Sequence, residues 1–251
     1  MSQEVDLNAD LGEGFDDASI LPFLSSCNVA CAAHAGSPET MRSTLAAAKR
    51  LGVSCGAHPG YPDRKNFGRR EMPLTLAELS ATISEQIDLI LQAASDTGVA
   101  LSHIKPHGAL YHGSNRRLDT ARCFLETVAR RQPAWVIVGQ AGSLLLEEAR
   151  RMGLRVAAEG FADRLYLEDG TLAPRGVAGA VFDSAEKAAA QALSLVADET
   201  VEASNGARLS VKVETICLHG DTPGAAALAR AIRSRLEEAG IEIRPLARMG
   251  R

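Results

Sequence analysis

The chain has 251 residues, 46% of them hydrophobic and 23% charged, and its 27 basic and 31 acidic side chains give a formal net charge of −4. This composition is typical of a folded globular protein and excludes one that is disordered over most of its length. The basic residues are scattered and form no long run, which excludes nucleic acid or an anionic membrane as the main partner and favours small-molecule chemistry.

Short apolar runs alternate with longer amphipathic stretches from one end of the chain to the other. The short runs predict strands at residues 5–10, 27–34, 53–58, 101–107, 135–138, 155–161 and 211–219, with 241–246 as a further candidate. The amphipathic stretches predict helices at residues 38–51, 76–97, 118–131, 143–152, 185–197 and 223–239. No linker or repeat separates these segments, so we expect one α/β domain over residues 1–251, with parallel strands joined by helical crossovers.

Reactive residues gather at the carboxyl ends of the predicted strands, where both open sheets and closed barrels of α/β proteins bind ligands. These residues are Asp10, His34, His58 and His107 at the first four strands, Glu159, Asp163 and Arg164 at the sixth, and His219 and Asp221 at the last. A barrel brings all its strand ends to one mouth. We therefore predict a single distorted (β/α) barrel, seven-stranded, rather than an open doubly wound sheet.

Alternation along two of the strands places polar side chains on a single face, because residues two apart in a strand share a face. The polar faces consist of Asp6, Asn8 and Asp10 in the first strand, and His103, Lys105 and His107 in the fourth. Burying such groups in an ordinary core would cost several kcal/mol unless each were paired. The pattern predicts a polar barrel mouth; a structural alternative is a buried ion pair between Asp6 and Lys105.

The loops that follow the strands are rich in glycine and carry groups suited to anions. His34 and His219 are each followed by the expected start of a helix, whose free N–H groups can hold a carboxylate or a phosphate. Arg69 and Arg70 place two cations on another loop, where they could clamp an anionic group or lie solvated on the surface.

Several familiar catalytic motifs are absent from the sequence. It lacks the phosphate loop, a complete G-x-G-x-x-G, the G-x-S-x-G nucleophile elbow and H-E-x-x-H. A nucleotide must then bind through another cradle or on a partner, and acid/base chemistry on water by carboxylates and histidines is favoured. A divalent metal is also left open, since suitable ligands are present at separate strands: Asp10, His34, His58, His107 and His219.

The five cysteines are odd in number and irregularly spaced. This argues against a disulfide framework and suits a reducing compartment. Cys27 and Cys31 would lie about 13 Å apart on a strand, too far to share one metal ion. The first residues show no targeting signal and no run of about 18 apolar residues occurs, so we expect a cytoplasmic protein without a membrane span.

Seven ordered segments resemble the LamB/YcsF family over nearly the whole chain. They are DLNADLGEG at 6–14, NVACAAHAG at 28–36, GAHPGYPD at 56–63, FGRR at 67–70, KPHGALY at 105–111, FADR at 161–164 and TICLHGD at 215–221. The resemblance implies a distorted seven-stranded β/α barrel similar to those of polysaccharide deacetylases and some glycoside hydrolases. It also implies ATP-dependent opening of 5-oxo-L-proline to L-glutamate, performed with separate B and C subunits.

The implied chemistry gives each candidate residue a role. Phosphorylation of the lactam oxygen would expose the ring carbon to water, which needs donors for the phosphoryl oxygens and a general base. We assign Lys105 to developing negative charge and Asp10, His58 or His107 to proton transfer. Substrate and phosphate contacts are assigned to Asn8, His34, Glu159, Asp163, Arg164, His219 and Asp221. ATP would bind to this chain or through the partner subunits.

Two departures from the family pattern concern the loop around His34. Ala33 stands where the family usually has an aromatic residue, and Ser37 replaces a carboxylate. Two functional alternatives also stay open. One is a metal-dependent amide hydrolase of the deacetylase type that acts alone. The other is a non-catalytic subunit that presents the substrate or holds B and C together.

Overall fold

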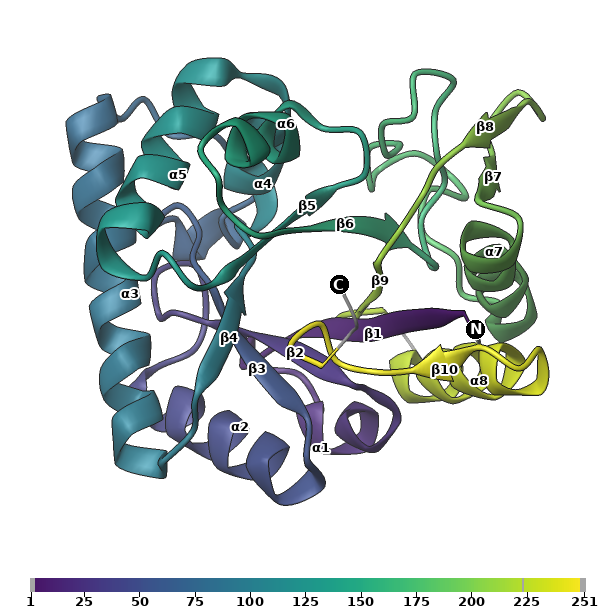
Figure 1. Cartoon of the computed structure of the whole chain (residues 1–251), viewed down its shortest axis with the longest axis horizontal. Helices are drawn as coiled ribbons and strands as arrows, with labels where there is room; N and C mark the ends of the chain where they lie inside the picture. The colour runs from purple at the N-terminus through teal and green to yellow at the C-terminus, as the bar shows by residue number, and fades with distance from the viewer. Residues whose placement is uncertain (1–2, 223, 249–251) are drawn as a thin grey trace.

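Seven parallel strands close into a barrel because β9 pairs with both β6 and β1 (Figure 1). The computed structural model describes residues 3–222 and 224–248. Around the barrel the strands are β1 (Glu4–Leu11), β2 (Ser26–Ala30), β3 (Ser54–His58), β4 (Leu101–Ile104), β5 (Val136–Gln140), β6 (Val156–Phe161) and β9 (Thr215–His219). The predicted closed barrel with seven strands is confirmed.

Helices surround the ring of strands on its outside (Figure 1). They are α1 (Asp17–Ile20), α2 (Pro38–Leu51), α3 (Leu76–Thr97), α4 (Gly108–Arg116), α5 (Leu118–Arg131), α6 (Leu144–Arg151), α7 (Ala185–Ala197) and α8 (Ala225–Glu238), with the 3-10 helices η1 (Leu21–Phe23) and η2 (Arg64–Asn66). The longest, α3, begins at a capping box between Thr75 and Glu78. It buries residues three and four apart, such as Leu79, Ile83, Ile87 and Ile90, so its apolar stripe faces the barrel.

Three barrel strands differ from their predicted lengths by three or more residues, and the other barrel strands by one or two at an end. Strand β2 ends at Ala30 rather than at residue 34, because Ala32 has a φ of 65°, outside the extended region. His34 therefore lies in the loop after the strand. Strand β4 ends at Ile104, although the N–H of His107 still bonds to the carbonyl of Pro59 on the neighbouring chain segment. Strand β9 starts at Thr215 rather than at 211.

Other elements add to the predicted set. A hairpin of β7 (Thr200–Glu202) and β8 (Arg208–Ser210) precedes β9, and α4 follows β4. The candidate strand at 241–246 is present as β10 (Glu242–Ile243), which pairs with the first residues of β1. The predicted start of the last helix at Pro223 lies outside the described residues, and α8 is described from Ala225.

Asp6 joins three strands in the barrel interior, away from the mouth. Its carboxylate accepts hydrogen bonds from the hydroxyls of Ser25 at 2.7 Å, Ser26 at 2.7 Å and Thr215 at 2.6 Å. The alternative of an Asp6–Lys105 ion pair is wrong, because Lys105 pairs with Asp10 and Glu159 instead. Asp6 is therefore a structural anchor between β1, β2 and β9.

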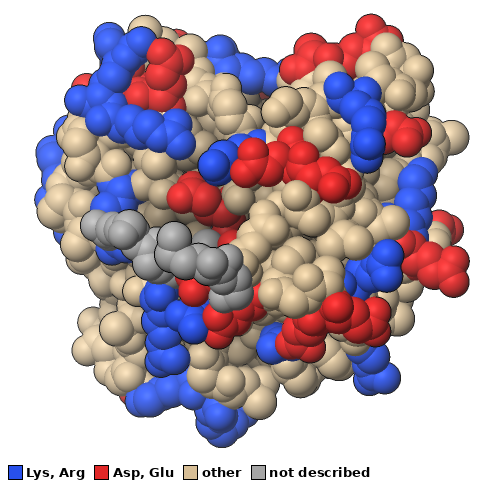
Figure 2. Space-filling model, turned by 45° about the vertical axis from the view of Figure 1, so that its right-hand side comes forward, with Lys and Arg blue, Asp and Glu red and all other residues tan. Residues whose placement is uncertain are grey.

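The cysteines form no disulfides, and the surface charges are mixed, as the sequence led us to expect. All five cysteines are buried free thiols, and the sulfur of Cys27 lies 3.8 Å from that of Cys55. Basic and acidic side chains are interspersed on the face shown in Figure 2. Within the described parts of the chain, each helix is too short or too polar to cross a bilayer.

Asp6 generates a prediction about stability and pH. Burial raises the pKa of Asp6 from 3.8 to about 6, although its three hydroxyl partners act in the opposite direction. The folded protein thus holds a proton that the unfolded chain releases. This contribution, up to about 3 kcal/mol, is complete below about pH 4 and disappears as the pH rises through about 6.

We expect Asp6→Asn, which cannot ionise, to flatten the dependence of the free energy of unfolding on pH between about 4 and 7. Urea unfolding at a series of pH values measures this slope. Asp198→Asn, on the protein surface, serves as the matched control and keeps the wild-type slope. An unchanged slope in Asp6→Asn would contradict the interpretation.

Candidate active site

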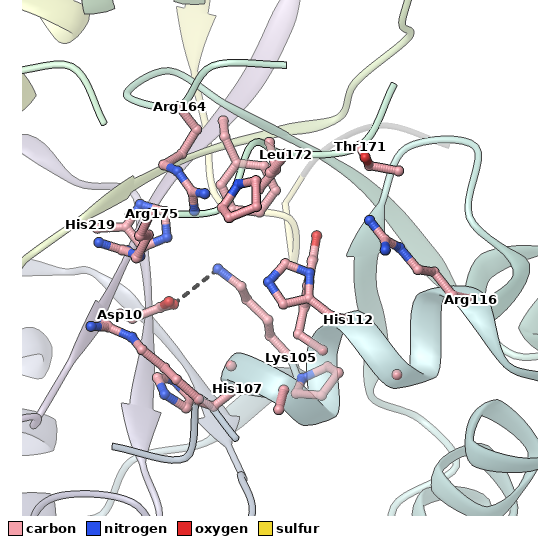
Figure 3. A pocket seen from close by; sticks show the side chains of 18 of the residues that line it. Asp10, Lys105, His107, His112, Arg116, Arg164, Thr171, Leu172, Arg175 and His219 are labelled. Atoms are coloured by element: carbon pink, nitrogen blue, oxygen red, sulfur yellow. Dashed lines mark hydrogen bonds and ion pairs between the residues drawn. The ribbon is translucent and has the colours of Figure 1, made fainter. Parts of the chain in front are cut away.

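A cavity of about 740 Å³ opens at the carboxyl ends of the strands (Figure 3). Six of the residues predicted from the sequence line it: Asp10, His58, Lys105, His107, Arg164 and His219. The other five lie behind or beside the lining: Asn8, His34, Glu159, Asp163 and Asp221. The convergence of strand ends on one site is therefore observed, although not every strand-end residue faces the cavity.

Lys105 forms the floor of this cavity. Its ammonium nitrogen lies 3.0 Å from Asp10 Oδ1 (Figure 3). It also lies 2.9 Å from Glu159 Oε1 and 3.1 Å from the sulfur of Cys217. Burial alone would lower the pKa of Lys105, but the adjacent Asp10 carboxylate, together with Cys217 and Glu159, holds it well above its ordinary value. The side chain is a permanent buried cation with all three donors engaged.

A layer of amides beneath the floor fixes the two carboxylates. Asn8 donates to Glu159 Oε1 at 3.2 Å and to Thr215 at 2.7 Å. Asn28 donates to Asn8 at 2.8 Å and to Asp10 Oδ1 at 2.9 Å. Asn8, predicted to contact substrate, is thus a positioning residue below the cavity. The two amides have defined partners and so restrain the carboxylates, although Glu159 Oε2 is buried without a hydrogen-bond partner among the described residues.

A second cluster at the floor contains three histidines and Glu13. Glu13 Oε1 lies 3.0 Å from His34 Nε2, 3.1 Å from His107 Nδ1 and 3.8 Å from His58 Nε2. His58 Nε2 is also 2.9 Å from His107 Nδ1 and 3.3 Å from Asp10. Their donor atoms lie close enough together to hold a metal ion, as do those of a second group, Asp10, Cys217 and His219.

Sequence reasoning missed Glu13. The available signal was a single carboxylate between Gly12 and Gly14, directly after the first strand. His34 was expected to contact substrate, but its ring lies behind that of His107, with the ring centres 3.7 Å apart and the planes nearly parallel. His34 and His107 thus form a stack whose outer member, His107, faces the cavity.

Two glycines allow the histidine rings to pack this closely. A Cβ atom on Gly60 would lie 2.8 Å from His34 Nδ1, and one on Gly68 would lie 2.8 Å from His34 Cβ. Gly68 also has a φ of +62°, which favours glycine. Gly60 of the GAHPGYPD segment and Gly68 of the FGRR segment are therefore explained by packing against the cluster.

His219 is held at the cavity wall by Asp163. The Asp163 carboxylate accepts hydrogen bonds from the backbone N–H of His219 at 3.0 Å, from its ring Nδ1 at 3.0 Å and from the hydroxyl of Thr222 at 3.2 Å. Asp163 is itself fully buried and does not line the cavity. Asp163 therefore orients His219 and does not itself face the cavity.

The rim of the cavity is rich in guanidinium groups. Five arginines line it: Arg69, Arg116, Arg117, Arg164 and Arg175. Arg164 and Arg175 lie across the cavity from Arg116 (Figure 3). Asp221, expected to contact substrate, pairs instead with Arg69 and with Arg175, the latter at 3.3 Å. Arg164 donates to the carbonyls of Ala173 and Ala180. The rim thus combines Arg164, which is held by two backbone carbonyls, with four arginines that are more exposed.

Sequence reasoning did not single out Arg116, Arg117 or Arg175. They come from α4, from the junction with α5, and from the long segment between β6 and α7, none of which carries a strand-end signal. The rim also holds Glu71 and Asp169, and Asp221 pairs with Arg69 and Arg175 beside it, so five arginines outnumber three carboxylates there. An arginine-rich mouth above a floor of acid/base groups is suited to a small anionic substrate.

Comparison with known proteins gives a consistent result. The LamB/YcsF family model matches residues 5–251. A protein of Pyrococcus furiosus, named as the A subunit of 5-oxoprolinase, is 45% identical over 249 residues, covering 97% of this chain and 98% of the relative. The crystal structure of the lactam utilization protein from Thermus thermophilus shares 42% identity, with a TM-score of 0.90, and covers 96% of this chain and 99% of that one.

More distant structures share the fold alone. A family 4 carbohydrate esterase from Streptomyces lividans has a TM-score of 0.52 at 13% identity, over 96% of this chain and 91% of that one. A GH113 β-1,4-mannanase has a TM-score of 0.52 at 14% identity, over 94% and 99%. The expected likeness to deacetylase and glycoside hydrolase barrels is confirmed.

Lys105 generates a prediction about stability. Replacing it with Met would leave Asp10 and Glu159 facing each other without a counterion, and removing one partner of a buried ion pair costs about 3–5 kcal/mol. We expect Lys105→Met to lower the free energy of unfolding by this amount in urea titrations at neutral pH. Lys212→Met removes an exposed cation 3.5 Å from Glu199 and is the matched control, with little effect. Equal stabilities for the two variants would refute the argument.

Proposed function

The chain belongs to the LamB/YcsF family, and from this premise we propose that it is the A subunit of an ATP-dependent 5-oxoprolinase. In this role it hydrolyses the lactam of 5-oxo-L-proline to L-glutamate together with the B and C subunits. The name and near-complete coverage of its relatives support the proposal. The observation that carries it is the cavity itself, in which an arginine rim stands above acid/base groups.

The proposed reaction begins by activating the lactam, because an amide carbonyl carbon is a poor electrophile. Transfer of the γ-phosphoryl group of ATP to the lactam oxygen releases ADP and makes the ring carbon reactive. Water adds to that carbon as a base takes its proton, and the carbon–nitrogen bond breaks as the nitrogen is protonated. The resulting acyl phosphate is hydrolysed by a second water molecule to glutamate and phosphate. The chain must therefore hold phosphoryl oxygens and move protons at one place.

The rim arginines are suited to the phosphoryl oxygens. Guanidinium groups bind phosphate through paired hydrogen bonds, and Arg69, Arg164 and Arg175 lie at the same mouth. Lys105 contributes positive charge from below. Of its three partners the Cys217 sulfur is the weakest acceptor. The N–H group of Lys105 that points to this sulfur is therefore the one that would turn toward developing negative charge on the substrate.

Proton transfer falls to the groups at the floor. Asp10, His58 and His107 all line the cavity and form a chain, in which His58 Nε2 lies 3.3 Å from Asp10 and 2.9 Å from His107 Nδ1. Such a chain can take a proton from water and deliver one to the lactam nitrogen. His219, oriented by Asp163, lies beside Asp10 on the adjacent strand and supplies a further polar contact.

We assign ATP to a site completed by the partner subunits, because the sequence carries no phosphate loop of its own. The buried free thiols suit a reducing compartment, and we place the reaction in the cytoplasm. The cluster of Glu13 with three histidines favours a second candidate function, a metal-dependent amide hydrolase that acts without ATP.

A coupled assay tests both functions. We expect the chain assembled with the B and C subunits to form glutamate and ADP together from 5-oxoproline and ATP, and to form neither without the partners. Asp10→Ala and His107→Ala should each reduce glutamate formation at least about 100-fold, because they remove groups of the proton-transfer chain. Wild-type turnover in either variant would remove that assignment. Glutamate formation by the isolated chain without ATP would favour the second function.

The rim arginines give a separate prediction. Arg175→Ala should lower kcat/KM for ATP-coupled glutamate formation about 10–100-fold, the effect of losing a charged hydrogen bond of about 1.5–3 kcal/mol. Steady-state kinetics of the assembled complex measure it. Arg208→Ala changes a strand residue of β8 that does not line the cavity and is expected to match the wild type. Equal effects of the two changes would exclude a role for the rim.

A further inference from the structure

Three donor atoms converge at one corner of the cavity floor, and each comes from a different loop or strand end. They are Glu13 Oε1 after β1, His58 Nε2 at the end of β3, and His107 Nδ1 before α4. All three side chains line the cavity. We propose that Glu13, His58 and His107 form a binding site for one divalent transition metal ion of the zinc class.

The spacing of the three atoms matches such an ion. They are separated by 2.9 Å, 3.1 Å and 3.8 Å. A triangle with these sides has a common point about 2 Å from each corner, which is the usual bond length of Zn²⁺ to imidazole nitrogen and carboxylate oxygen. Two histidines and a glutamate with a remaining open position form a ligand set found in catalytic zinc sites.

The outer ring nitrogens strengthen the assignment. His58 Nδ1 lies 2.8 Å from the carbonyl oxygen of Lys105, and His107 Nε2 lies 2.9 Å from that of Phe67. A carbonyl oxygen only accepts hydrogen bonds, so each ring donates from this nitrogen. In the neutral rings the inner nitrogens then both present lone pairs, to each other and to Glu13. Such outer hydrogen bonds to backbone carbonyls are typical of metal-binding histidines.

A cation between the two inner nitrogens and the Glu13 oxygen would remove the repulsion among them. Lone pairs 2.9 Å apart repel, and the Glu13 oxygen 3.1 Å from His107 Nδ1 adds a further negative charge. One proton can lie between two of the three atoms and leaves the third facing a lone pair. A metal ion at the common point contacts all three at once, which is the physical reason for preferring it.

His34 has a supporting place. Its Nε2 lies 3.0 Å from the same Glu13 oxygen, and its ring is stacked on His107. Parallel stacked rings cannot both direct their lone pairs at one ion, so His34 holds Glu13 and His107 in position by hydrogen bonding and packing. Unlike the three ligands, His34 does not line the cavity.

The second group of potential ligands is less suitable. Asp10 and Cys217 both contact the ammonium of Lys105, at 3.0 Å and 3.1 Å, so a metal ion there would meet a fixed positive charge. The Glu13 site has no such cation among its contacts in the described residues. Its open position faces the cavity, where a water molecule or a carbonyl oxygen could bind the ion.

Zinc binding by the isolated full-length chain tests the site. After removal of metal with a chelator, titration with Zn²⁺ against a chromogenic chelator should show one ion per chain. Glu13→Gln and His107→Asn should each weaken binding at least about 100-fold. His112→Asn, at another histidine of the cavity wall, and Cys217→Ala, in the second group of ligands, should bind Zn²⁺ as the wild type does.

Co²⁺ gives an independent readout. It should produce visible absorption without the near-ultraviolet band of a cobalt–thiolate bond, since the site contains no cysteine. If a ligand variant fails to fold, NMR of the wild-type histidine rings decides instead, because Zn²⁺ should shift the signals of His58 and His107 and leave that of His112 in place. No bound Zn²⁺, unchanged affinity in Glu13→Gln, or a cobalt–thiolate band would overturn the proposal.

These measurements use the chain without the B and C subunits and without ATP. The metal site and the proposed 5-oxoprolinase function can therefore fail separately: Zn²⁺ can bind to a chain whose complex makes no glutamate, and an active complex can contain no metal. With the ion bound, the inner nitrogens of His58 and His107 are its ligands, and proton transfer in the proposed reaction falls to Asp10.

Discussion

The rest of the structure depends on a buried ammonium group. Lys105 lies in the barrel interior between Asp10 and Glu159, which come from β1 and β6, while Lys105 follows β4. A charged side chain buried away from water is tolerated only when oppositely charged or hydrogen-bonding partners lie within a few ångströms of it. This requirement sets the relative positions of strands far apart in sequence, and the amides of Asn8 and Asn28 extend it to β2 and β9. The barrel interior is polar at its mouth because these pairs replace an apolar core.

The groups suited to catalysis and substrate binding lie at the floor and rim of the cavity, above this ion-pair network. The floor supplies carboxylates and imidazoles at hydrogen-bond distance from one another, and the rim supplies guanidinium groups from loops and from the end of α4. A net charge of −4 describes the surface as a whole, yet the cavity mouth is cationic. The overall charge therefore gives no guide to the sign of the substrate, because a few arginines at one opening dominate the local field.

Much of the candidate site was accessible to sequence reasoning. Asp10, His58 and His107 were found because strand ends converge in any parallel α/β barrel, whatever the exact closure. Glu13 and Arg175 were missed because loop residues follow no period that reports their direction. Asp163 was found but misassigned: its position at a strand end was right, whereas its partner, the ring of His219, is known only from the folded chain.

The sequence by itself determined the barrel strands, most of the helices, their order and the polar face of β1, because the periods of strands and helices are local properties of a few neighbouring residues. Only the tertiary structure decided that β9 closes on β1, that His34 lies behind His107, and that Glu13 meets His58. These contacts join segments dozens of residues apart. Their distances depend on the packing of the whole barrel, to which no short stretch of sequence is sensitive.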